Sequence, residues 1–499
     1  MKVVNDKLLN TPIAEIPEYY ERAKKAYLFW KNLHIHERMA YLRNLRHYMV
    51  DQLEELVEVI AKDTGKVPVE ALTADILTTL DAIQYIEKHG PRVLGKRRMK
   101  TPLLLFGKKS YVEYKPRGVV LVISPWNFPL QLAMVPVISA LISGNAVILK
   151  PSEVTPMVGR LIEDLFQKAG FPQDVVQVAH GGKEAGSAFV QGEPDYIFFT
   201  GSVRTGKMIQ EEAAKKLIPT TLELGGKDPM IVFADANLKR AVHGAIWGAF
   251  TNAGQVCMSV ERVYVERKIY DPFIKKLVEE VNQLKLGSGM NDDIGMITYP
   301  GQVSIIREHI EDALSKGAKL LTGTSPEHWI LDKELFIPPM VLVDVGQDMK
   351  IMQEETFGPV LPVIPFDSED EAVHLANDSS FGLNASVWSS DLRKAERVAT
   401  RLVTGNVVIN DVIITVANHY LPFGGVKQSG IGRYHGEIGL QIFCHQTSVM
   451  SDKGKREREV NWFPYEGKLP LFFSLIRSYF GKHRSWGGLL KSYLHLLRK

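Results

Sequence analysis

The chain has 499 residues, of which 45% are apolar and 23% are charged. These fractions are typical of soluble globular proteins and exclude disordered, collagenous and polytopic membrane proteins. The length predicts two or three domains. The net charge of +3 is unevenly distributed, because residues 451–499 hold 11 basic and 4 acidic residues while the rest of the chain holds 49 and 53. This basic tail is therefore expected to face an acidic surface.

The only cysteines are Cys257 and Cys444. Two are too few for a disulfide framework or a thiolate zinc cluster, which favours a reducing compartment. The N-terminus has no apolar run long enough for a signal peptide, and prolines interrupt the longest apolar stretch, residues 118–149, so it is not a membrane span. We therefore expect a cytoplasmic protein. We also expect no metal site, because the 14 histidines show no metal-ligand spacing.

The N-terminal part differs in pattern from the segment that follows it. Residues 16–88 place apolar side chains at helical spacing with charges between them, which predicts a run of amphipathic helices. Residues 99–114 predict a β-hairpin instead, with one strand over 103–106, a Gly-Lys-Lys turn, and a second strand over 111–114.

Between residues 118 and 223, short apolar runs alternate with helical segments. Strands are predicted at 119–123, 146–149, 175–178, 196–199 and 220–224, and helices at 131–142, 155–169, 183–190 and 203–216. This alternation is typical of a parallel, doubly wound sheet in an α/β fold. Such sheets bind ligands at the carboxyl ends of their strands.

A second α/β set is predicted from residue 230 onward, with strands at 230–233 and 261–265 and helices at 237–253 and 271–284. The two sets predict two α/β lobes with a cleft between them. In the tail, residues 469–499 place apolar side chains on one face of two short helices, which Gly487 and Gly488 are expected to separate.

Cys257 is a candidate nucleophile. It follows the small residues of Asn252-Ala253-Gly254-Gln255-Val256, where a loop could expose it. The thiolate is the reactive form, and an ordinary thiol with a pKa of about 8.5 supplies little of it at pH 7, so Cys257 would need activation. The alternative is a small buried apolar side chain, which suits Cys444 better.

Two further polar residues follow predicted strands. Glu223 precedes Leu224-Gly225-Gly226, where the glycines allow a sharp turn or a close approach to a ligand, although a solvated or ion-paired glutamate is the alternative. Asn127 lies in the rigid loop Ser124-Pro125-Trp126-Asn127-Phe128-Pro129. Its amide could donate a hydrogen bond to an oxyanion, or only satisfy its own turn.

Two other segments are candidates for binding a cofactor. Lys150, Ser152 and Glu153 join a strand to a helix; strand-end acids bind ribose hydroxyls and cations bind phosphate or hydroxyl oxygens, and a plain helix cap is equally open. Gly201, Ser202 and Gly206 lie at a helix start, where free N–H groups favour phosphate. Their spacing matches neither the dinucleotide fingerprint nor a P-loop.

Together with Glu354-Glu355-Thr356-Phe357-Gly358-Pro359-Val360 and Pro422-Phe423-Gly424-Gly425-Val426-Lys427-Gln428-Ser429-Gly430, these segments resemble the aldehyde dehydrogenase superfamily. All of them occur in the order of that family, and the resemblance runs from about residue 15 to 450. The segment 111–118 and Arg433-Tyr434-His435-Gly436 are similar to the class 3 or fatty aldehyde dehydrogenase branch.

The resemblance implies a Rossmann-type cofactor domain over residues 1–225, with the hairpin 99–114 as an oligomerisation element, and an α/β catalytic domain over 226–410. Residues 411–450 would return to the cofactor domain and supply a bridging strand. Residues 451–499 would form a basic amphipathic tail. The branch further implies a homodimer.

The implied mechanism begins when the Cys257 thiolate attacks the aldehyde carbonyl, while the Asn127 amide and the Cys257 backbone N–H hold the oxyanion. Hydride leaves for the nicotinamide, and Glu223 activates the water that hydrolyses the thioester. Because Glu223 is present, the resemblance argues against the CoA-acylating relatives, which lack a glutamate at that position.

The implied cofactor site consists of Trp126, Lys150, Ser152, Glu153, Gly201, Ser202, Gly206, Leu224, Gly225, Glu355 and Phe357. Glu153 should repel a 2′-phosphate and favour NAD. Lys150 would act in the opposite direction, so NADP stays open.

The expected reaction is therefore the oxidation of a medium- or long-chain aliphatic aldehyde to its acid, with a small-molecule substrate and no nucleic-acid partner. The tail 469–499 predicts either a peripheral helix on an anionic membrane surface or a helix packed on its own subunit or on the dimer mate. Two other interpretations stay open: a dehydrogenase of small polar semialdehydes, and a catalytically silent, membrane-associated scaffold of the same fold.

Overall fold

The computed structural model describes residues 10–329 and 335–498. The chain forms two compact units, a main unit of Met1–Gly95 and Tyr114–Thr447, and a smaller unit of Lys96–Glu113 and Ser448–Lys499. We call the second one the hairpin–tail unit. It joins two segments that lie more than 330 residues apart in the sequence.

The N-terminal region is helical, as predicted. It consists of α1 (Ile16–Trp30), α2 (Ile35–Asp51), α3 (Leu53–Thr64), a short α4 (Pro68–Glu70), a π-helical turn (Ala71–Leu77) and α5 (Thr78–Leu94). The helix α3 ends at Gly65, whose φ of 75° is the left-handed conformation that glycine adopts without strain. π-Helical turns are frequent at functional sites, and this one lies beside the loop that carries Asn127.

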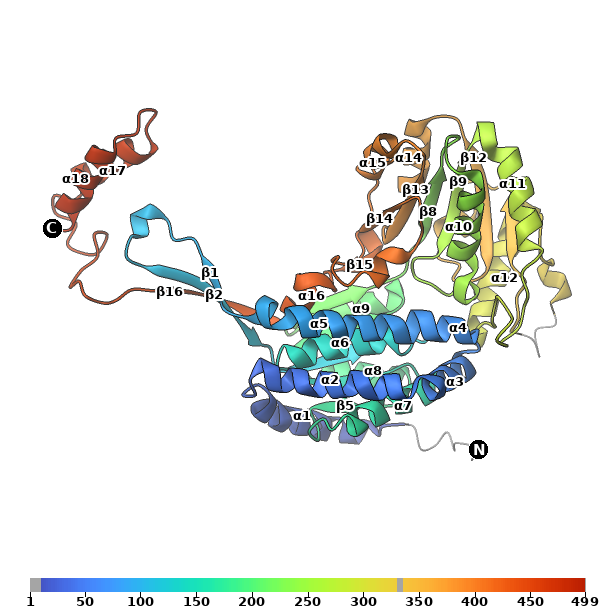
Figure 1. Cartoon of the computed structure of the whole chain (residues 1–499), viewed down its shortest axis with the longest axis horizontal. Coiled ribbons are helices and arrows are strands. Elements are labelled where there is room, and N and C mark those ends of the chain that lie inside the picture. The colour runs from blue at the N-terminus through green and yellow to red at the C-terminus, as the bar shows by residue number, and fades with distance from the viewer. Residues whose placement is uncertain (1–9, 330–334, 499) are drawn as a thin grey trace. The chain divides into compact units, whose positions relative to one another are not determined.

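The first sheet of the main unit has six strands in the order β15-β7-β6-β3-β4-β5. Its parallel strands are β3 (Val119–Ile123), β4 (Ala146–Lys150), β5 (Val176–Val178), β6 (Tyr196–Thr200) and β7 (Thr220–Glu223), linked by α6 (Gln131–Ile142), α7 (Pro156–Lys168), α8 (Lys183–Gln191) and α9 (Val203–Ala214). The predicted doubly wound sheet is confirmed (Figure 1).

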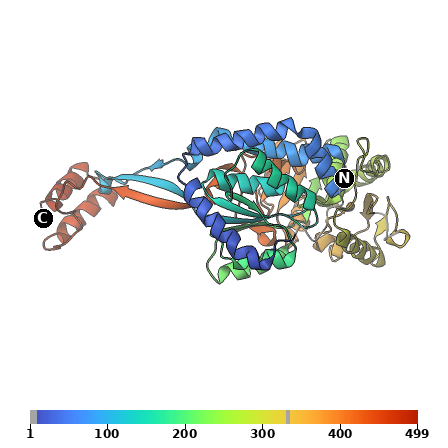
Figure 2. The same ribbon diagram turned by 90° about the horizontal axis from the view of Figure 1, so that it is seen from below.

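This sheet is buried on both faces, which explains why its strands are continuous apolar runs. Side chains on one face of the sheet pack against α6 and α7, and side chains on the other face pack against α1, α8 and α9. Figure 2 shows helices on both sides of the sheet. The strand order reverses at β3, which lies between β6 and β4, and ligands of such sheets bind where this reversal occurs.

The second sheet has seven strands in the order β10-β11-β12-β9-β8-β13-β14. They are β8 (Asp228–Val232), β9 (Val260–Glu266), β10 (Lys319–Leu320), β11 (Met340–Val343), β12 (Val360–Phe366), β13 (Asn384–Trp388) and β14 (Asn406–Ile409), and only β10 is antiparallel to its neighbour. The helices are α10 (Leu238–Phe250), α11 (Arg267–Val281), α12 (Pro300–Ser315), α13 (Lys350–Gln353), α14 (Glu369–Asn377) and α15 (Leu392–Ala399).

Two helix boundaries in this part were predicted wrongly. The helix predicted at 237–253 ends at Phe250, because Asn252 and Ala253 have φ values of 51° and 54° and cannot continue a right-handed helix. The helix predicted at 271–284 spans Arg267–Val281, so it begins four residues before the prediction, and Pro272 lies inside it.

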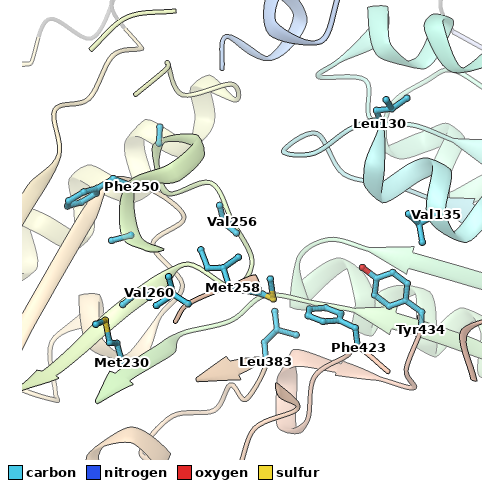
Figure 3. Packing of buried hydrophobic residues seen from close by; sticks show 14 of the residues in the cluster. Leu130, Val135, Met230, Phe250, Val256, Met258, Val260, Leu383, Phe423 and Tyr434 are labelled. Carbon is cyan, nitrogen blue, oxygen red and sulfur yellow. The ribbon is translucent and has the colours of Figure 1, made fainter. Parts of the chain in front are cut away.

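The chain then returns to the first sheet. The strand β15 (Gly430–Ile431) pairs antiparallel with β7, with Gly430 opposite Glu223, and α16 (Gly436–Gln441) follows. A Cβ atom at Gly430 would lie 2.4 Å from the Leu222 carbonyl oxygen, so only glycine allows this approach. One continuous apolar cluster connects both sheets, and Figure 3 shows members of it from the second sheet, Met230 and Val260, and from the returning segment, Phe423 and Tyr434.

A three-stranded sheet in the order β1-β2-β16 is formed by β1 (Arg97–Met99), β2 (Lys109–Pro116) and β16 (Cys444–Ser451), and the hairpin–tail unit includes β1, most of β2 and the second half of β16. The predicted hairpin is confirmed, with Arg97 opposite Val112. Its first strand was placed wrongly, because Leu103–Leu105 form a 3-10 turn in the connection. Pro102 precedes this turn; it cannot donate a ladder hydrogen bond, and its carbonyl accepts the Leu105 N–H at 2.9 Å.

The tail forms two helices, α17 (Leu469–Phe480) and α18 (Trp486–Leu496). Gly487 and Gly488 do not separate them, contrary to the prediction, but lie in the first turn of α18, because the Ser485 hydroxyl caps this helix by accepting the Gly488 N–H at 3.1 Å. The break is at residues 481–485. Within residues 10–329 and 335–498, no helix is long and apolar enough to cross a membrane.

Candidate active site

Cys257 lies in the loop between α10 and β9 and is half-buried. Its neighbours Val256 and Met258 are anchored in the apolar core (Figure 3). Gln255 is fully buried and donates hydrogen bonds from Nε2 to the carbonyl oxygens of Asn252 at 2.9 Å and Met296 at 3.2 Å. The loop is therefore fixed on both sides of the thiol.

The Asn127 side chain meets this loop. Asn127 follows β3, is buried, and donates from Nδ2 to the Gln255 carbonyl oxygen at 3.0 Å. Its own carbonyl oxygen accepts a hydrogen bond from Asn252 Nδ2 at 3.1 Å. Since an amide nitrogen carries two N–H groups, one remains to donate to a ligand beside Cys257.

Glu223 ends β7 and is buried. Among the described residues, neither of its carboxylate oxygens has a hydrogen-bond partner. Burial raises the pKa of Glu223 well above its usual range, and the positive charge of Arg433 opposes this shift without cancelling it. A carboxyl group with an elevated pKa is suited to take up a proton near neutral pH.

The thiol of Cys257 lies in an acidic environment. Burial raises the pKa of Cys257, and the charges of Glu355, Asp228 and Glu223 raise it further. Burial and these charges therefore both disfavour the thiolate. Because the thiolate is the nucleophile, a positive charge or a proton acceptor has to come into play for attack.

Several predicted cofactor residues share the carboxyl edge of the first sheet. Trp126 follows β3, Lys150 ends β4, Gly201 follows β6 and Leu224 follows β7. The structure thus brings together segments that lie about 100 residues apart, at the edge where parallel sheets bind ligands.

Lys150 and Glu153 form an ion pair at this edge. The Lys150 Nζ donates to Glu153 Oε2 at 2.7 Å, with the lysine side chain buried and the glutamate side chain half-exposed. The Ser152 hydroxyl accepts the Val154 N–H at 3.2 Å and shapes the turn between them. The charge of Glu153 is therefore largely compensated by its neighbour.

The start of α9 contains the predicted phosphate residues. Ser202 caps α9 by accepting the Thr205 N–H at 3.3 Å, and the Gly201 N–H donates to the Glu223 carbonyl oxygen at 3.0 Å. A Cβ atom at Gly206 would lie 2.6 Å from Leu224 Cδ2. Gly206 therefore allows the helix to pack closely against the Leu224 side chain at the end of β7.

Glu355 and Phe357 lie across from the Gly225-Gly226 turn. Glu355 Oε1 accepts the Gly226 N–H at 3.0 Å, and a Cβ atom at Gly225 would lie 2.3 Å from Glu355 Oε2. Burial, reinforced by the charge of Glu261, raises the pKa of Glu355 to about 8. The Phe357 ring stands edge-on to that of Trp126, with 5.5 Å between the ring centroids.

Sequence reasoning missed the buried ion pair that holds this segment. Lys227 Nζ donates to Glu261 Oε2 at 2.5 Å and to Thr356 Oγ1 at 3.0 Å, and the Glu261 oxygens accept the backbone N–H groups of Thr356 at 2.8 Å and Phe357 at 2.9 Å. These contacts stabilise Phe357 at a φ of 51°, which is rare for a bulky residue. The sequence did contain a signal for this ion pair. Two adjacent charged residues, Glu261 and Arg262, lie inside an otherwise apolar strand, and charged residues are rarely buried unless they are paired.

A second buried ion pair was missed as well. Lys66 Nζ donates to Asp75 Oδ2 at 2.8 Å and to the Asn127 carbonyl oxygen at 2.8 Å. Asp75 Oδ1 accepts the N–H groups of Leu130 at 3.1 Å and Gln131 at 3.2 Å. The N-terminal helical region therefore supports the Asn127 loop. These contacts join residues that lie far apart in the sequence, so no local sequence pattern predicts them.

Over the two described ranges, no group of three or more histidine, cysteine, aspartate or glutamate residues is placed to hold a metal ion. The acidic and basic groups at the sheet edge, the capped start of α9 and the close glycines of the 225–226 turn do fit a dinucleotide. The site thus combines a fixed thiol, an amide donor and a buried carboxyl group with a dinucleotide edge.

The family model described as the aldehyde dehydrogenase family matches residues 9–449. The chain belongs to this family and is an NAD(P)-dependent aldehyde dehydrogenase. The oxidoreductase class, the α/β fold and the NAD or NADP cofactor expected from the sequence are thereby confirmed.

Among known proteins, the chain is 46% identical over 453 residues to a 4,4′-diapolycopene aldehyde oxidase of Methylomonas, covering 91% of this chain and 84% of the relative. It is 36% identical to a putative succinate-semialdehyde dehydrogenase [NADP(+)] of Mycobacterium bovis, covering 87% and 84%. A solved betaine aldehyde dehydrogenase of Staphylococcus aureus in complex with NAD+ superposes with a TM-score of 0.85 at 32% identity, covering 91% and 90%.

Proposed function

We propose that this enzyme oxidises long, apolar aldehydes to carboxylic acids through a thioester on Cys257, as a member of the class 3 or fatty aldehyde branch. The convergence of the Cys257 loop, the Asn127 amide and the buried Glu223 supports the chemistry most strongly. The choice of an apolar substrate is supported by the relative named for an aldehyde of diapolycopene, an apolar polyene.

In the proposed reaction, the Cys257 sulfur bonds to the carbonyl carbon after the thiol proton has left. The second N–H of Asn127 Nδ2 and the Cys257 backbone N–H stabilise the oxyanion. NAD(P) supplies the hydride acceptor. Glu223 then takes a proton from water, whose oxygen attacks the thioester carbonyl and releases the acid and the thiolate. One aldehyde, one water and one NAD(P)+ give one carboxylate, one NAD(P)H and two protons.

For the cofactor, we propose that Glu355 and Phe357 position the nicotinamide ribose and ring, with Trp126, Leu224 and Gly225 beside them. The adenosine ribose would lie at Lys150, Ser152 and Glu153, and the pyrophosphate at Gly201, Ser202 and Gly206. The 2.7 Å pair between Lys150 and Glu153 reduces the repulsion of a 2′-phosphate. Because the carboxylate of Glu153 still disfavours a 2′-phosphate, we propose NAD as the preferred cofactor, and because Lys150 reduces this effect, we propose use of NADP as well.

Glu261→Gln tests the proposed positioning of the nicotinamide by Glu355 and Phe357, because Glu261 accepts the backbone N–H groups of Thr356 and Phe357 in this segment. A glutamine has one acceptor oxygen and can no longer accept both backbone N–H groups, and a hydrogen bond to a charged acceptor contributes about 1.5–3 kcal/mol. We expect the Kd for NADH, measured by fluorescence titration, to rise at least about tenfold, with a smaller change in kcat at saturating cofactor.

Two further variants make this result specific. Glu261→Gln combined with Lys227→Met avoids an unpaired buried charge. If circular dichroism shows an intact fold, this double variant should have the same raised Kd for NADH as Glu261→Gln alone. Glu354→Gln, an exposed neighbour that pairs with His309 at 3.5 Å, should bind NADH normally. An unchanged Kd for NADH in both Glu261 variants would contradict the proposed role of Glu355 and Phe357 in positioning the nicotinamide.

A panel of aldehydes from two to sixteen carbons, assayed with both cofactors, tests the substrate class. Each buried methylene contributes about 0.8 kcal/mol, so kcat/KM should rise several-fold per added methylene for as long as the added methylenes are buried on binding. Succinate semialdehyde is the control, because the Mycobacterium bovis relative is named for it. A preference for this charged substrate over hexanal and decanal would favour the alternative, a dehydrogenase of small polar semialdehydes.

We further propose a homodimer, joined through the hairpin 99–114 and the bridging strand within residues 411–450, and a cytoplasmic enzyme that is peripheral on a membrane. The tail 469–499 is the proposed membrane contact. A long apolar aldehyde partitions into lipid, so a membrane surface is where such an enzyme meets its substrate.

A further inference from the structure

The hairpin–tail unit concentrates positive charge. Residues 96–113 and 448–499 hold 17 basic and 5 acidic residues, a net charge of +12, while the remaining chain holds 43 and 52, a net charge of −9. Three of the five acidic residues are already paired inside the unit, since Lys96 contacts Glu113 and Lys108 contacts Asp452 and Glu459. The excess basic charge is therefore available to a partner of opposite charge.

The two tail helices bury only one of their apolar faces. Leu475, Leu489 and Leu496 pack between the helices. A second stripe on α17, formed by Leu469, Phe473, Ile476 and Phe480, is exposed, and α18 carries a matching exposed stripe of Trp486, Leu490, Leu494 and Leu497. Both stripes have the three- and four-residue spacing of one helix face.

The two stripes lie on the same side of the helix pair. At 100° per residue, each stripe is rotated from the buried face of its helix by roughly a third of a turn, in the same sense along the chain. The helices are packed side by side and joined by the short connection at 481–485, so they run antiparallel. In an antiparallel pair, equal rotations from the facing sides point to one common side. The stripes thus form one apolar surface, with Arg477 and Lys491 at its edges.

The hairpin connection belongs to the same unit. Leu104 packs against the cluster of Leu475, Leu489 and Leu496. Leu103 and Phe106 are exposed next to it. They line an open cavity of about 580 Å³ together with basic residues that include Lys100 and Lys109. The hairpin therefore repeats the combination of exposed apolar side chains and positive charge seen on the tail helices.

We propose that the whole hairpin–tail unit, hairpin connection included, is a module that docks on the surface of bilayers containing anionic lipid. The proposal deepens, and rests on, the proposed membrane contact of the tail. The net charge of +12 favours an anionic surface. Exposed aromatic residues before α17, Trp462, Phe463 and Tyr465, are the kind that lie at the headgroup level.

Co-sedimentation of the full-length enzyme with vesicles tests the proposal. Binding should be at least about tenfold stronger to vesicles of phosphatidylcholine with 30% phosphatidylglycerol than to phosphatidylcholine alone, and it should weaken at 0.5 M salt. Phe473→Ser with Phe480→Ser should reduce binding at least about tenfold, because both lie on the common apolar surface. Lys100→Glu with Lys109→Glu should reduce it as well, which a docking surface made of the tail alone does not predict.

Matched controls separate this proposal from the proposed function. Leu28→Ser with Phe29→Ser changes two equally exposed apolar residues of α1 in the main unit and should leave vesicle binding unchanged. Oxidation of hexanal, a soluble aldehyde, should be normal in all these variants, so a loss of binding is not a loss of the enzyme. Equal binding to both kinds of vesicle, or unchanged binding in the Phe473 and Phe480 variant, would overturn the proposal. A change of oligomeric state in that variant, without vesicle binding by the wild type, would assign the surface to a second copy instead.

Discussion

Replacing Cys257 with alanine is expected to reduce the rate of NADH formation from hexanal by at least about 10³-fold, because no other nucleophile in the site can form the thioester. The loop around Cys257 is held by Gln255 and by the buried neighbours Val256 and Met258. The substitution removes one small, half-buried side chain, so the fold and the binding of NADH should be retained. Absorbance at 340 nm measures the rate, and fluorescence titration measures the cofactor affinity.

The second cysteine provides the matched control. Cys444 is buried at the start of β16 and carries no proposed role in the chemistry. Cys444→Ala should keep most of the activity, even if it lowers the melting temperature through the small cavity it leaves. Wild-type activity in the Cys257→Ala variant would refute the nucleophile, whereas a wild type that forms no NADH from hexanal or a longer aldehyde would favour the interpretation of the chain as a silent scaffold.

Glu223→Gln is expected to separate the two halves of the reaction. Without the base, acylation of Cys257 can still occur, but hydrolysis of the thioester should slow by about 10²–10⁴-fold. In stopped flow the variant should release up to one NADH per active site and then almost stop. A steady rate equal to that of the wild type, with no burst, would show that another group activates the water.

The same variant tests the burial of the carboxyl group. The pKa of Glu223 is raised in the folded state, so the unfolded chain loses its proton at a lower pH than the folded protein. The stability of the wild type therefore declines as the pH rises from the ordinary glutamate pKa towards the folded value. Since the glutamine does not ionise, the Glu223→Gln variant should melt at the same or a higher temperature than the wild type at pH 8, while being the slower enzyme.

Much of the fold follows from local pattern. Residues 119–123 and 146–150 are apolar runs bounded by turns, and they became adjacent parallel strands because repeated β-α units leave few other arrangements. The errors have equally local causes. The apolar composition of Leu103–Leu105 predicted a strand, but these residues form a 3-10 turn that Pro102 starts. Gly487 and Gly488 read as a break, but a serine cap outweighs the low helix propensity of two glycines in a first turn.

The candidate site divides in the same way. Glu223, Asn127 and Lys150 were predictable because each ends or follows a strand, and the ends of parallel strands meet at one edge. The supporting pairs, Lys66 with Asp75 and Lys227 with Glu261, were not predicted. Their partners come from different elements, and a buried charge gives no sign in the sequence of which distant residue will neutralise it.

The return of the chain through β15 has a consequence for how the enzyme matures. Without β15, β7 would be an edge strand, and an edge strand offers unpaired N–H and C=O groups to other chains. Glu223 lies on this edge, opposite Gly430. During synthesis, the strand that carries the proposed base, Glu223, therefore stays open until more than 400 residues have been made, and we expect a chain that stops short of residue 430 to be both inactive and prone to aggregate.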